Sequence, residues 1–263
     1  MSPARRAPIA RLSPTARSAV LWAAAALGAV GLALIWVARI AAARFVYVSE
    51  LGATGEPTAE VFRWGLVLVA VAAMLVALCA PRLRPSVRWL AVASPAAVLA
   101  GSAIAFGVAS QITCTVGCPL PVGPAFTWQD LIHTSCAVLG FAGAAFVMLQ
   151  VATDEAFRAL ARFSLVSAIA VAVIAGVGGL LSLFRFGTQV GGVLELVATT
   201  IALLWLVGLA AFLAVAVRRD PQGAAVIDRS DAAHGGHAHP IAPAQAQPSQ
   251  AATPARIAAT YSE

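Results

Sequence analysis

Six long apolar stretches, separated by short polar loops, constrain this chain more than any other feature. They are Ser18–Ala42, Val61–Ala80, Trp89–Ala109, Leu131–Val151, Phe163–Phe184 and Val190–Val217. A bilayer core about 30 Å thick needs about 20 helical residues to cross it. Backbone groups find no partner in lipid, and apolar stretches without alternation exclude a β-barrel. The chain is therefore predicted to be an all-α, polytopic membrane bundle with six transmembrane helices.

The composition supports one membrane domain. Hydrophobic residues make up 60% of the chain and charged residues 11%, whereas soluble domains carry about a quarter charged residues. The loops are too short for a second domain. We expect a cytoplasmic N-terminal segment at 1–17, the six-span domain at 18–217 and a disordered tail at 218–263, where Ala, Pro, Gln and Gly predominate.

The basic residues indicate the orientation. All of them are arginine. Most lie before the first stretch or just after the second, fourth and sixth stretches: Arg5, Arg6, Arg11, Arg17, Arg82, Arg84, Arg88, Arg158, Arg162, Arg218 and Arg219. By the positive-inside rule these loops and both termini are cytoplasmic, in a plasma membrane. This pattern explains the net charge of +6 without nucleic acid, so membrane lipids are the expected partners.

Polar residues in a bilayer are costly and mark candidate sites. Once the orientation is fixed, the polar residues of the spans gather near the outer surface, and the inner halves carry almost none. The candidate ligand-binding residues are Glu50, Asp130, His133, Arg185 and Glu195. This asymmetry predicts an outward-facing polar pocket formed by the first, fourth and sixth spans with the Arg185 loop.

Two interpretations remain open for these residues. Asp130 and His133 are three positions apart, so they share a helix face and suit proton transfer. Alternatively, Asp130 stabilises a helix N-terminus and His133 is an interfacial residue. Glu195 lies about one turn inside the sixth stretch, after Gly191-Gly192, where Arg39 or Arg185 is a candidate ion-pair partner. Such a pair serves structure or binding equally well.

Cysteine usage predicts one disulfide. Cys114 and Cys118 share an outer loop on the oxidising side, with Gly117 between them and Pro119 after them. A metal there would need further ligands, and His133 is the only histidine of the membrane region. The tail histidines (His234, His237 and His239) form a flexible cluster of a kind that is commonly incidental. No metal and no cofactor are therefore predicted.

Small residues recur every four positions in two of the stretches. They are Cys136, Gly140 and Ala144 in the fourth, and Ala168, Ala172 and Gly176 in the fifth. Such stripes allow membrane helices to approach closely. We expect them to pack against neighbouring helices of the same chain.

Short motifs connect the chain with a known family. Ser49-Glu50-Leu51-Gly52, Gly117-Cys118 and Asp130-x-x-His133 resemble segments of the prokaryotic domain of unknown function 998 family. The resemblance covers about Trp22–Val217, and it implies a bacterial plasma-membrane protein whose activity is not established. More distantly, the chain resembles six-span proteins of the DRAM/Frag/Sfk type. The implied family residues are Ser49, Glu50, Gly52, Cys118, Asp130 and His133.

Three functions remain for such a chain. The favoured hypothesis is a non-enzymatic membrane protein that binds a lipid or small molecule in the outer pocket, or acts as an accessory subunit of a membrane-protein partner. The second is a lipid hydrolase or transferase that uses Asp130 and His133 with Glu50 or Ser49. The third is a proton-coupled transporter that depends on Glu195. The sequence contains no complete catalytic set and leaves the oligomeric state open.

Overall fold

The computed structural model describes residues 12–43, 46–80, 83, 85–119, 123–184 and 187–219. Six α-helices make up most of this part of the chain: α1 (Pro14–Ala41), α2 (Ala59–Cys79), α3 (Pro95–Gln111), α4 (Trp128–Ala152), α5 (Arg158–Leu183) and α6 (Thr188–Arg219). Short 3-10 segments lie in the connections: η2 (Ser49–Gly52), η3 (Leu90–Val92), η4 (Gly123–Ala125) and η5 (Glu155–Phe157). The described residues contain no strand, so the all-α prediction is confirmed.

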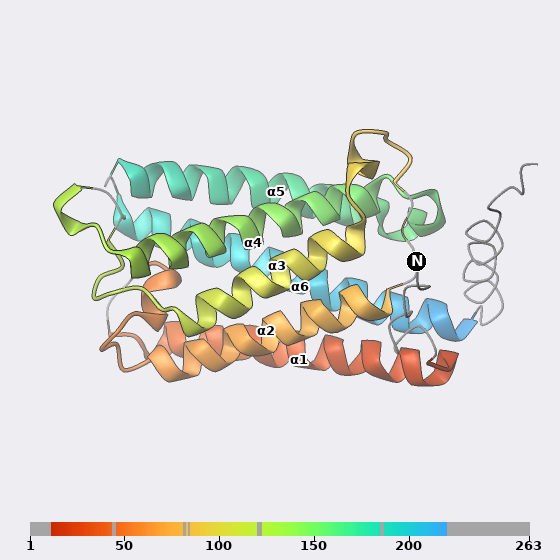
Figure 1. Ribbon diagram of the computed structural model, residues 1–263, viewed down its shortest axis with the longest axis horizontal. Helices are drawn as coiled ribbons and strands as arrows, with labels where there is room; N and C mark the ends of the chain where they lie inside the picture. The colour runs from red at the N-terminus through yellow and green to blue at the C-terminus, as the bar shows by residue number, and fades with distance from the viewer. Residues whose placement is uncertain are drawn as a thin grey trace, which may run out of the picture.

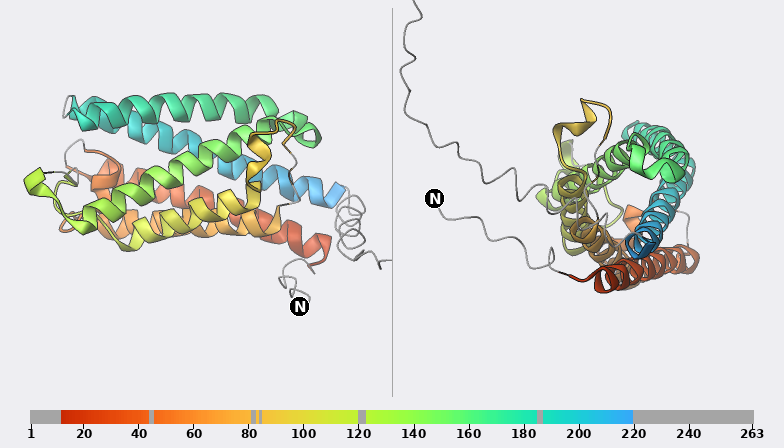
Figure 2. Two further views of the ribbon diagram at one scale, coloured as in Figure 1. Left: turned by 45° about the horizontal axis from the view of Figure 1, so that its top comes forward. Right: turned by 90° about the vertical axis from the view of Figure 1, so that its right-hand side faces the viewer.

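The helices form a closed ring (Figures 1 and 2). Each helix packs on the next along the chain, and α6 returns to pack on α1, while α4 and α5 make the sparsest contact of the six. Because successive helices run in opposite directions, α1 begins and α6 ends at one end of the ring, which we call the terminal end. The α1–α2, α3–α4 and α5–α6 connections lie at the opposite end, which we call the loop end.

Five of the helices have the length and composition of membrane spans: α1, α2, α4, α5 and α6. The remaining helix, α3, is apolar but has only 17 residues, which gives it a length of about 25 Å at 1.5 Å per residue. The chain is therefore a multi-pass membrane protein built as a helical bundle. Arg185, residues 1–11 of the N-terminal segment and residues 220–263 of the tail, with its histidines, lie outside the described residues.

The third predicted span, Trp89–Ala109, began too early. The helix starts at Pro95, because the Ser94 side chain accepts a hydrogen bond from the backbone N–H of Ala97 (3.1 Å) and caps the helix. Proline at the first helical position needs no donor, which reinforces this start. The preceding residues form η3 instead, and the Gln150 amide of α4 donates to the carbonyl of Leu90 (2.7 Å) and to that of Ala93 (2.8 Å).

Two apolar clusters fill the ring. The cluster in the terminal half surrounds Trp205, whose indole N–H donates to the Ser164 hydroxyl (2.9 Å). The cluster in the loop half contains Leu51 of η2, Phe62 of α2 and Leu196 of α6. Because this second cluster includes η2, the segment after α1 is packed into the bundle and is not a free loop. It forms the floor of the polar end described below.

Candidate functional site

The segment that follows α1 lies directly on the first turns of α6. A Cβ atom on Gly192 would stand 2.7 Å from the Val46 carbonyl oxygen, and one on Gly191 would stand 2.5 Å from the Tyr47 hydroxyl. Only glycine allows an approach this close. The Gly191–Gly192 pair is therefore a packing surface that seats residues 46–48 on α6.

Glu195 lies one turn further along α6 and holds the start of η2. Its carboxylate accepts hydrogen bonds from the backbone N–H groups of Val48 (2.7 Å) and Ser49 (3.3 Å). Bonds from N–H groups to a carboxylate are among the stronger hydrogen bonds in proteins. Of the arginines suggested by the sequence, Arg39 is buried in the last turn of α1. Thus Glu195 fixes the Ser49–Gly52 motif in place.

The predicted Cys114–Cys118 disulfide is present in the segment between α3 and α4. Gly117 and Cys118 both have positive φ angles, +76° and +44°, and this left-handed turn brings Cys118 back toward Cys114. The Cys114 carbonyl accepts a hydrogen bond from the backbone N–H of Thr54 (3.0 Å). Cys114 is fully buried, so the disulfide is part of the packed loop end.

The Asp130 side chain is hydrogen-bonded to the same loop. It is fully buried, and its carboxylate accepts hydrogen bonds from the Thr115 backbone N–H (2.8 Å), the Thr115 hydroxyl (2.9 Å) and the Thr127 hydroxyl. Thr127 is the N-cap of α4, and its side chain accepts in turn from the Asp130 N–H (3.0 Å). The Thr127 side chain thus caps the N-terminus of α4, and its hydroxyl is held in turn by the Asp130 carboxylate. This arrangement supports the helix N-terminus interpretation of Asp130.

His133 is held by the end of α3. Its Nδ1 lies 3.1 Å from the Ala109 carbonyl oxygen and 2.8 Å from that of Ile112. A carbonyl only accepts, so Nδ1 carries the proton and Nε2 is the nitrogen left for another partner. His133 is 3% exposed, and the hydrogen bonds of the described residues do not join it to Asp130. The proposed Asp–His proton pair therefore lacks a direct hydrogen bond.

A cleft of about 890 Å3 opens between α4 and α5. Its polar end is formed at the loop end by Ser49, Glu50, Gly117, Cys118, His133 and Glu195. From there it follows α4 as far as Ala145, a distance of about 18 Å along the helix. Val138 and Leu180 line its walls and are 62% and 56% exposed. In a chain that crosses a bilayer, such exposed apolar edges face lipid.

The wall that α5 contributes is made largely of small residues: Ala172, Ala175, Gly176, Gly178 and Gly179. A Cβ atom added to Gly176 or Gly179 would meet nothing within 4 Å. The predicted close packing of the Ala168–Ala172–Gly176 stripe is therefore wrong at Gly176, which faces open space. In α4 the expectation holds, because a Cβ on Gly140 would stand 2.8 Å from the Phe106 ring of α3.

A second cavity of about 80 Å3 lies inside the ring. It shares five lining residues with the cleft, Ser49, His133, Ala137, Phe141 and Glu195, and the rest of its lining is mostly apolar. The three polar ones among them, Ser49, His133 and Glu195, thus stand between the interior of the ring and the cleft. They form the one boundary at which a molecule in the cleft meets polar groups from α4, α6 and η2.

The structure brings only part of the predicted site together. Glu50, His133 and Glu195 line the cleft, whereas Asp130 is buried behind the disulfide loop. Arg185 lies outside the described residues. Sequence reasoning missed the walls of α4 and α5, for which the small-residue stripe was the available signal.

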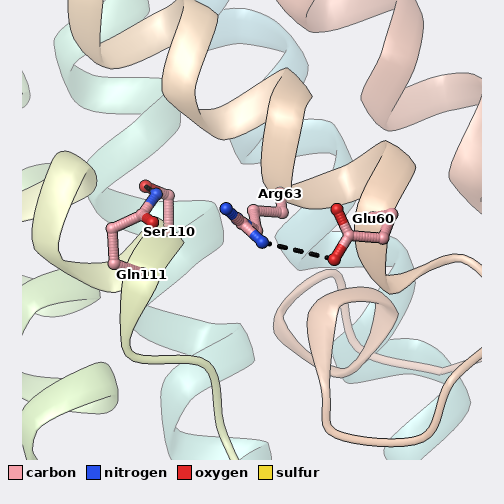
Figure 3. Close-up of polar contacts among 4 residues, drawn as sticks. All are labelled: Glu60, Arg63, Ser110 and Gln111. Carbon is pink, nitrogen blue, oxygen red and sulfur yellow. Dashed lines mark hydrogen bonds and ion pairs between the residues drawn. The ribbon is translucent and has the colours of Figure 1, made fainter.

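Another polar group lies on the outside of the ring at the loop end (Figure 3). Arg63 of α2 forms an ion pair with Glu60 (3.2 Å), and the side chain of Glu60 is 72% exposed. Figure 3 places Ser110 and Gln111, at the end of α3, beside this pair. Exposed pairs of this kind contribute at most about 1 kcal/mol to stability. Glu60, Arg63 and Gln111 form a polar rim on α2 and α3, whereas Ser110 is buried, and none of the four lines the cleft.

The family described as "Protein of unknown function (DUF998)" matches residues 45–212. The match confirms the resemblance found in the sequence motifs. It begins just before η2 and ends within α6, so it includes Glu50, the disulfide, Asp130, His133 and Glu195. No curated protein and no solved structure matches the chain.

Proposed function

We propose that this chain, which belongs to the DUF998 family of proteins of unknown function, binds a membrane lipid in the α4–α5 cleft. We further propose that it does so in a bacterial plasma membrane, with both termini cytoplasmic and the loop end outside. The family match and the arginine distribution support this setting. The cleft then opens to the outer half of the bilayer.

The observation that carries the proposal is the division of the cleft into a polar end and an apolar length. Glu50, His133 and Glu195 meet at the loop end, and apolar walls follow α4 and α5 from there. Ligand sites combine mostly apolar walls with a few convergent polar groups in this way. A lipid matches both parts, since its head group meets the polar end while an acyl chain lies along the walls.

Access to the cleft also favours a lipid. The α4–α5 contact is the sparsest in the ring, and the cleft edges at Val138 and Leu180 are exposed. A bilayer lipid can enter sideways there without leaving the membrane. A molecule from water would instead have to pass the packed loop end, where η2 and the disulfide loop lie.

One observation favours the hydrolase alternative: Ser49 and His133 line the same cleft. A serine nucleophile needs a base within hydrogen-bond reach. The carbonyls of Ala109 and Ile112 engage only Nδ1 of His133. Among the described residues, however, no hydrogen bond joins its Nε2 to the Ser49 hydroxyl, and Asp130 is bound to Thr115 and Thr127. Lipid binding therefore requires less rearrangement than catalysis, and release of free fatty acid from bound phospholipid would instead support the enzyme.

The test is lipid retention, measured by native mass spectrometry of the purified chain. Gly176→Leu places a large side chain in the cleft from α5, and its Cβ meets no protein atom within 4 Å. Gly101→Leu on α3 is the matched control, because its Cβ also meets nothing within 4 Å. The wild type and Gly101→Leu should carry a lipid, and Gly176→Leu should lose it. A wild type without lipid, or equal retention in both variants, would overturn the proposal.

A further inference from the structure

We propose that Cys114, Cys118 and His133 form a zinc site when the disulfide is reduced. No metal was predicted from the sequence, because a site at the two cysteines would need further ligands. His133 is 15 residues after Cys118 and lies in another element. The fold brings the three together: both sulfur atoms and a ring nitrogen of His133 lie within 4.8 Å of one another. Two cysteines and one histidine are a ligand set that zinc takes in proteins.

The distances suit a metal after a small adjustment. Zinc binds sulfur at about 2.3 Å and nitrogen at about 2.0 Å, so its ligand atoms stand roughly 3.3–3.8 Å apart. Once the disulfide is open, the two sulfurs must separate to that spacing while the imidazole stays where it is. The left-handed turn at Gly117 and Cys118 can relax in this step, because the covalent link that holds it is gone.

The environment of His133 matches that of a metal ligand. A ligating histidine almost always donates its other N–H to a carbonyl or carboxylate, which fixes the ring. Here Nδ1 is bound to the carbonyls of Ala109 and Ile112. Nε2 is therefore the nitrogen available to zinc. Since the side chain is 3% exposed, the ring is already held before any metal arrives.

Charge and access also fit. Two thiolates neutralise Zn2+, so the occupied site carries no net charge into a buried region. Cys118 and His133 line the cleft, whereas Cys114 is fully buried behind them. The fourth position of a tetrahedral ion thus faces the cleft, where a water molecule completes the shell.

The redox step is a thiol–disulfide exchange with an external dithiol. The dithiol gives two electrons and two protons to the Cys114–Cys118 bond and becomes a disulfide itself, leaving two thiols on this chain. Zinc binding then displaces the two thiol protons. In the test tube a water-soluble phosphine supplies the electrons and becomes a phosphine oxide, with water providing the oxygen and the two protons.

The experiment uses Co2+ as a spectroscopic substitute for zinc in the purified full-length chain. After reduction by the phosphine and removal of the reagent without air, one Co2+ per chain should give a thiolate-to-cobalt charge-transfer band that Zn2+ abolishes. The unreduced protein and Cys118→Ser should give no such band. His133→Ala loses one of the three protein ligands, so it should bind Co2+ more weakly than the wild type by at least about 10-fold, the lower end of the loss caused by removing even an outer-shell partner. Cys136→Ala is the control, since Cys136 is a free cysteine one turn from His133, and it should behave as the wild type.

Absence of the band in the reduced wild type would overturn the site. The same follows if Cys136→Ala abolishes binding, or if His133→Ala binds as tightly as the wild type. Should His133→Ala fail to fold, Cys118→Ser and Cys136→Ala still decide between this site and another thiol. Lipid retention by the oxidised protein is independent of every outcome.

Discussion

The carboxylate of Glu195 accepts a 2.7 Å hydrogen bond from the backbone N–H of Val48, 147 residues away along the chain. The contact joins the last helix to the segment that follows the first helix. It therefore helps to close the ring at the loop end. Because η2 begins at the next residue, the same contact determines where Ser49 and Glu50 enter the cleft.

We predict that Glu195→Ala lowers the free energy of unfolding by roughly 2 kcal/mol, since it removes the acceptor of two backbone hydrogen bonds. Glu195→Gln keeps one acceptor oxygen and should recover part of this loss. The control is Glu60→Ala, which loses an exposed pair with Arg63 and should change stability by less than about 0.5 kcal/mol. Thermal unfolding in detergent provides the comparison, and equal shifts for Glu195→Ala and Glu60→Ala would contradict the structural role.

Asp130→Ala should be more damaging, by about 2–4 kcal/mol. The substitution leaves the Thr115 N–H and the hydroxyls of Thr115 and Thr127 without their buried acceptor, although the backbone N–H of residue 130 can still donate to the Thr127 side chain. Asp130→Asn, which keeps one acceptor oxygen, should fall between this variant and the wild type. The measurements are thermal unfolding and the fraction of chains with the Cys114–Cys118 bridge. A fully stable Asp130→Ala protein that no longer retains lipid would point instead to a binding role.

Glycine substitutions should have opposite signs at two positions. A Cβ on Gly31 of α1 would stand 2.8 Å from the Gly65 carbonyl oxygen of α2, whereas a Cβ on Gly101 of α3 would meet nothing within 4 Å. Gly31→Ala therefore forces two helices apart and should destabilise the protein by 1 kcal/mol or more, on the order of other overpacked sites. Gly101→Ala should be neutral or stabilising by up to about 1 kcal/mol. Denaturant unfolding distinguishes them, and similar effects would show that the α1–α2 contact is looser than described.

The membrane architecture could be predicted from the sequence because hydropathy over about 20 residues is a strong, local signal. The third span shows the limit of this signal. Hydropathy continued back to Trp89, but Ser94-Pro95 is a helix start that depends on cap chemistry rather than on apolarity. Ser94 and Pro95 thus determine where α3 begins, and a hydropathy average does not detect this signal.

The site was predictable only in part, for a different reason. Polar residues near the loop end could be found by position, and of the candidates chosen in this way Glu50, His133 and Glu195 line the cleft. Their partners are backbone groups, such as the Val48 N–H and the Ile112 carbonyl. Because nearly every residue has these groups, the sequence does not indicate which of them a side chain will bind. Whether a small residue packs or leaves space also depends on the neighbouring helix, which is why Gly140 and Gly176 differ.

The orientation of the ring in the membrane is a prediction from the arginines, and reporter fusions can check it. A reporter that is active in the cytoplasm should work after Arg82 and after Arg219, and one that is active outside should work after Gly123. Arg219 ends α6 at the terminal end, whereas Gly123 begins η4 at the loop end. A cytoplasmic signal at Gly123 would invert the model of a cleft open to the outer half of the bilayer.

The start of α3 should depend on Gln150. This residue is fully buried, and its amide nitrogen donates to the Leu90 and Ala93 carbonyls. Gln150→Leu has a similar volume but no donor, so it leaves two carbonyls unpaired and should lower the free energy of unfolding by about 2–3 kcal/mol. Gln150→Glu also loses both donations when ionised and adds a buried charge, so it should cost more.

Gln111→Leu is the matched control for these variants, because Gln111 is exposed at the other end of α3 and its amide nitrogen donates to the adjacent Ser110 hydroxyl. Hydrogen exchange should locate the effect. Faster exchange in Gln150→Leu should be confined to residues 90–98 while the loop end stays protected, because the two apolar clusters stabilise the halves of the ring separately. If the exchange of η3 and α3 is the same in Gln150→Leu and Gln111→Leu, the cap at Ser94 and Pro95 sets the start of α3 without help from α4.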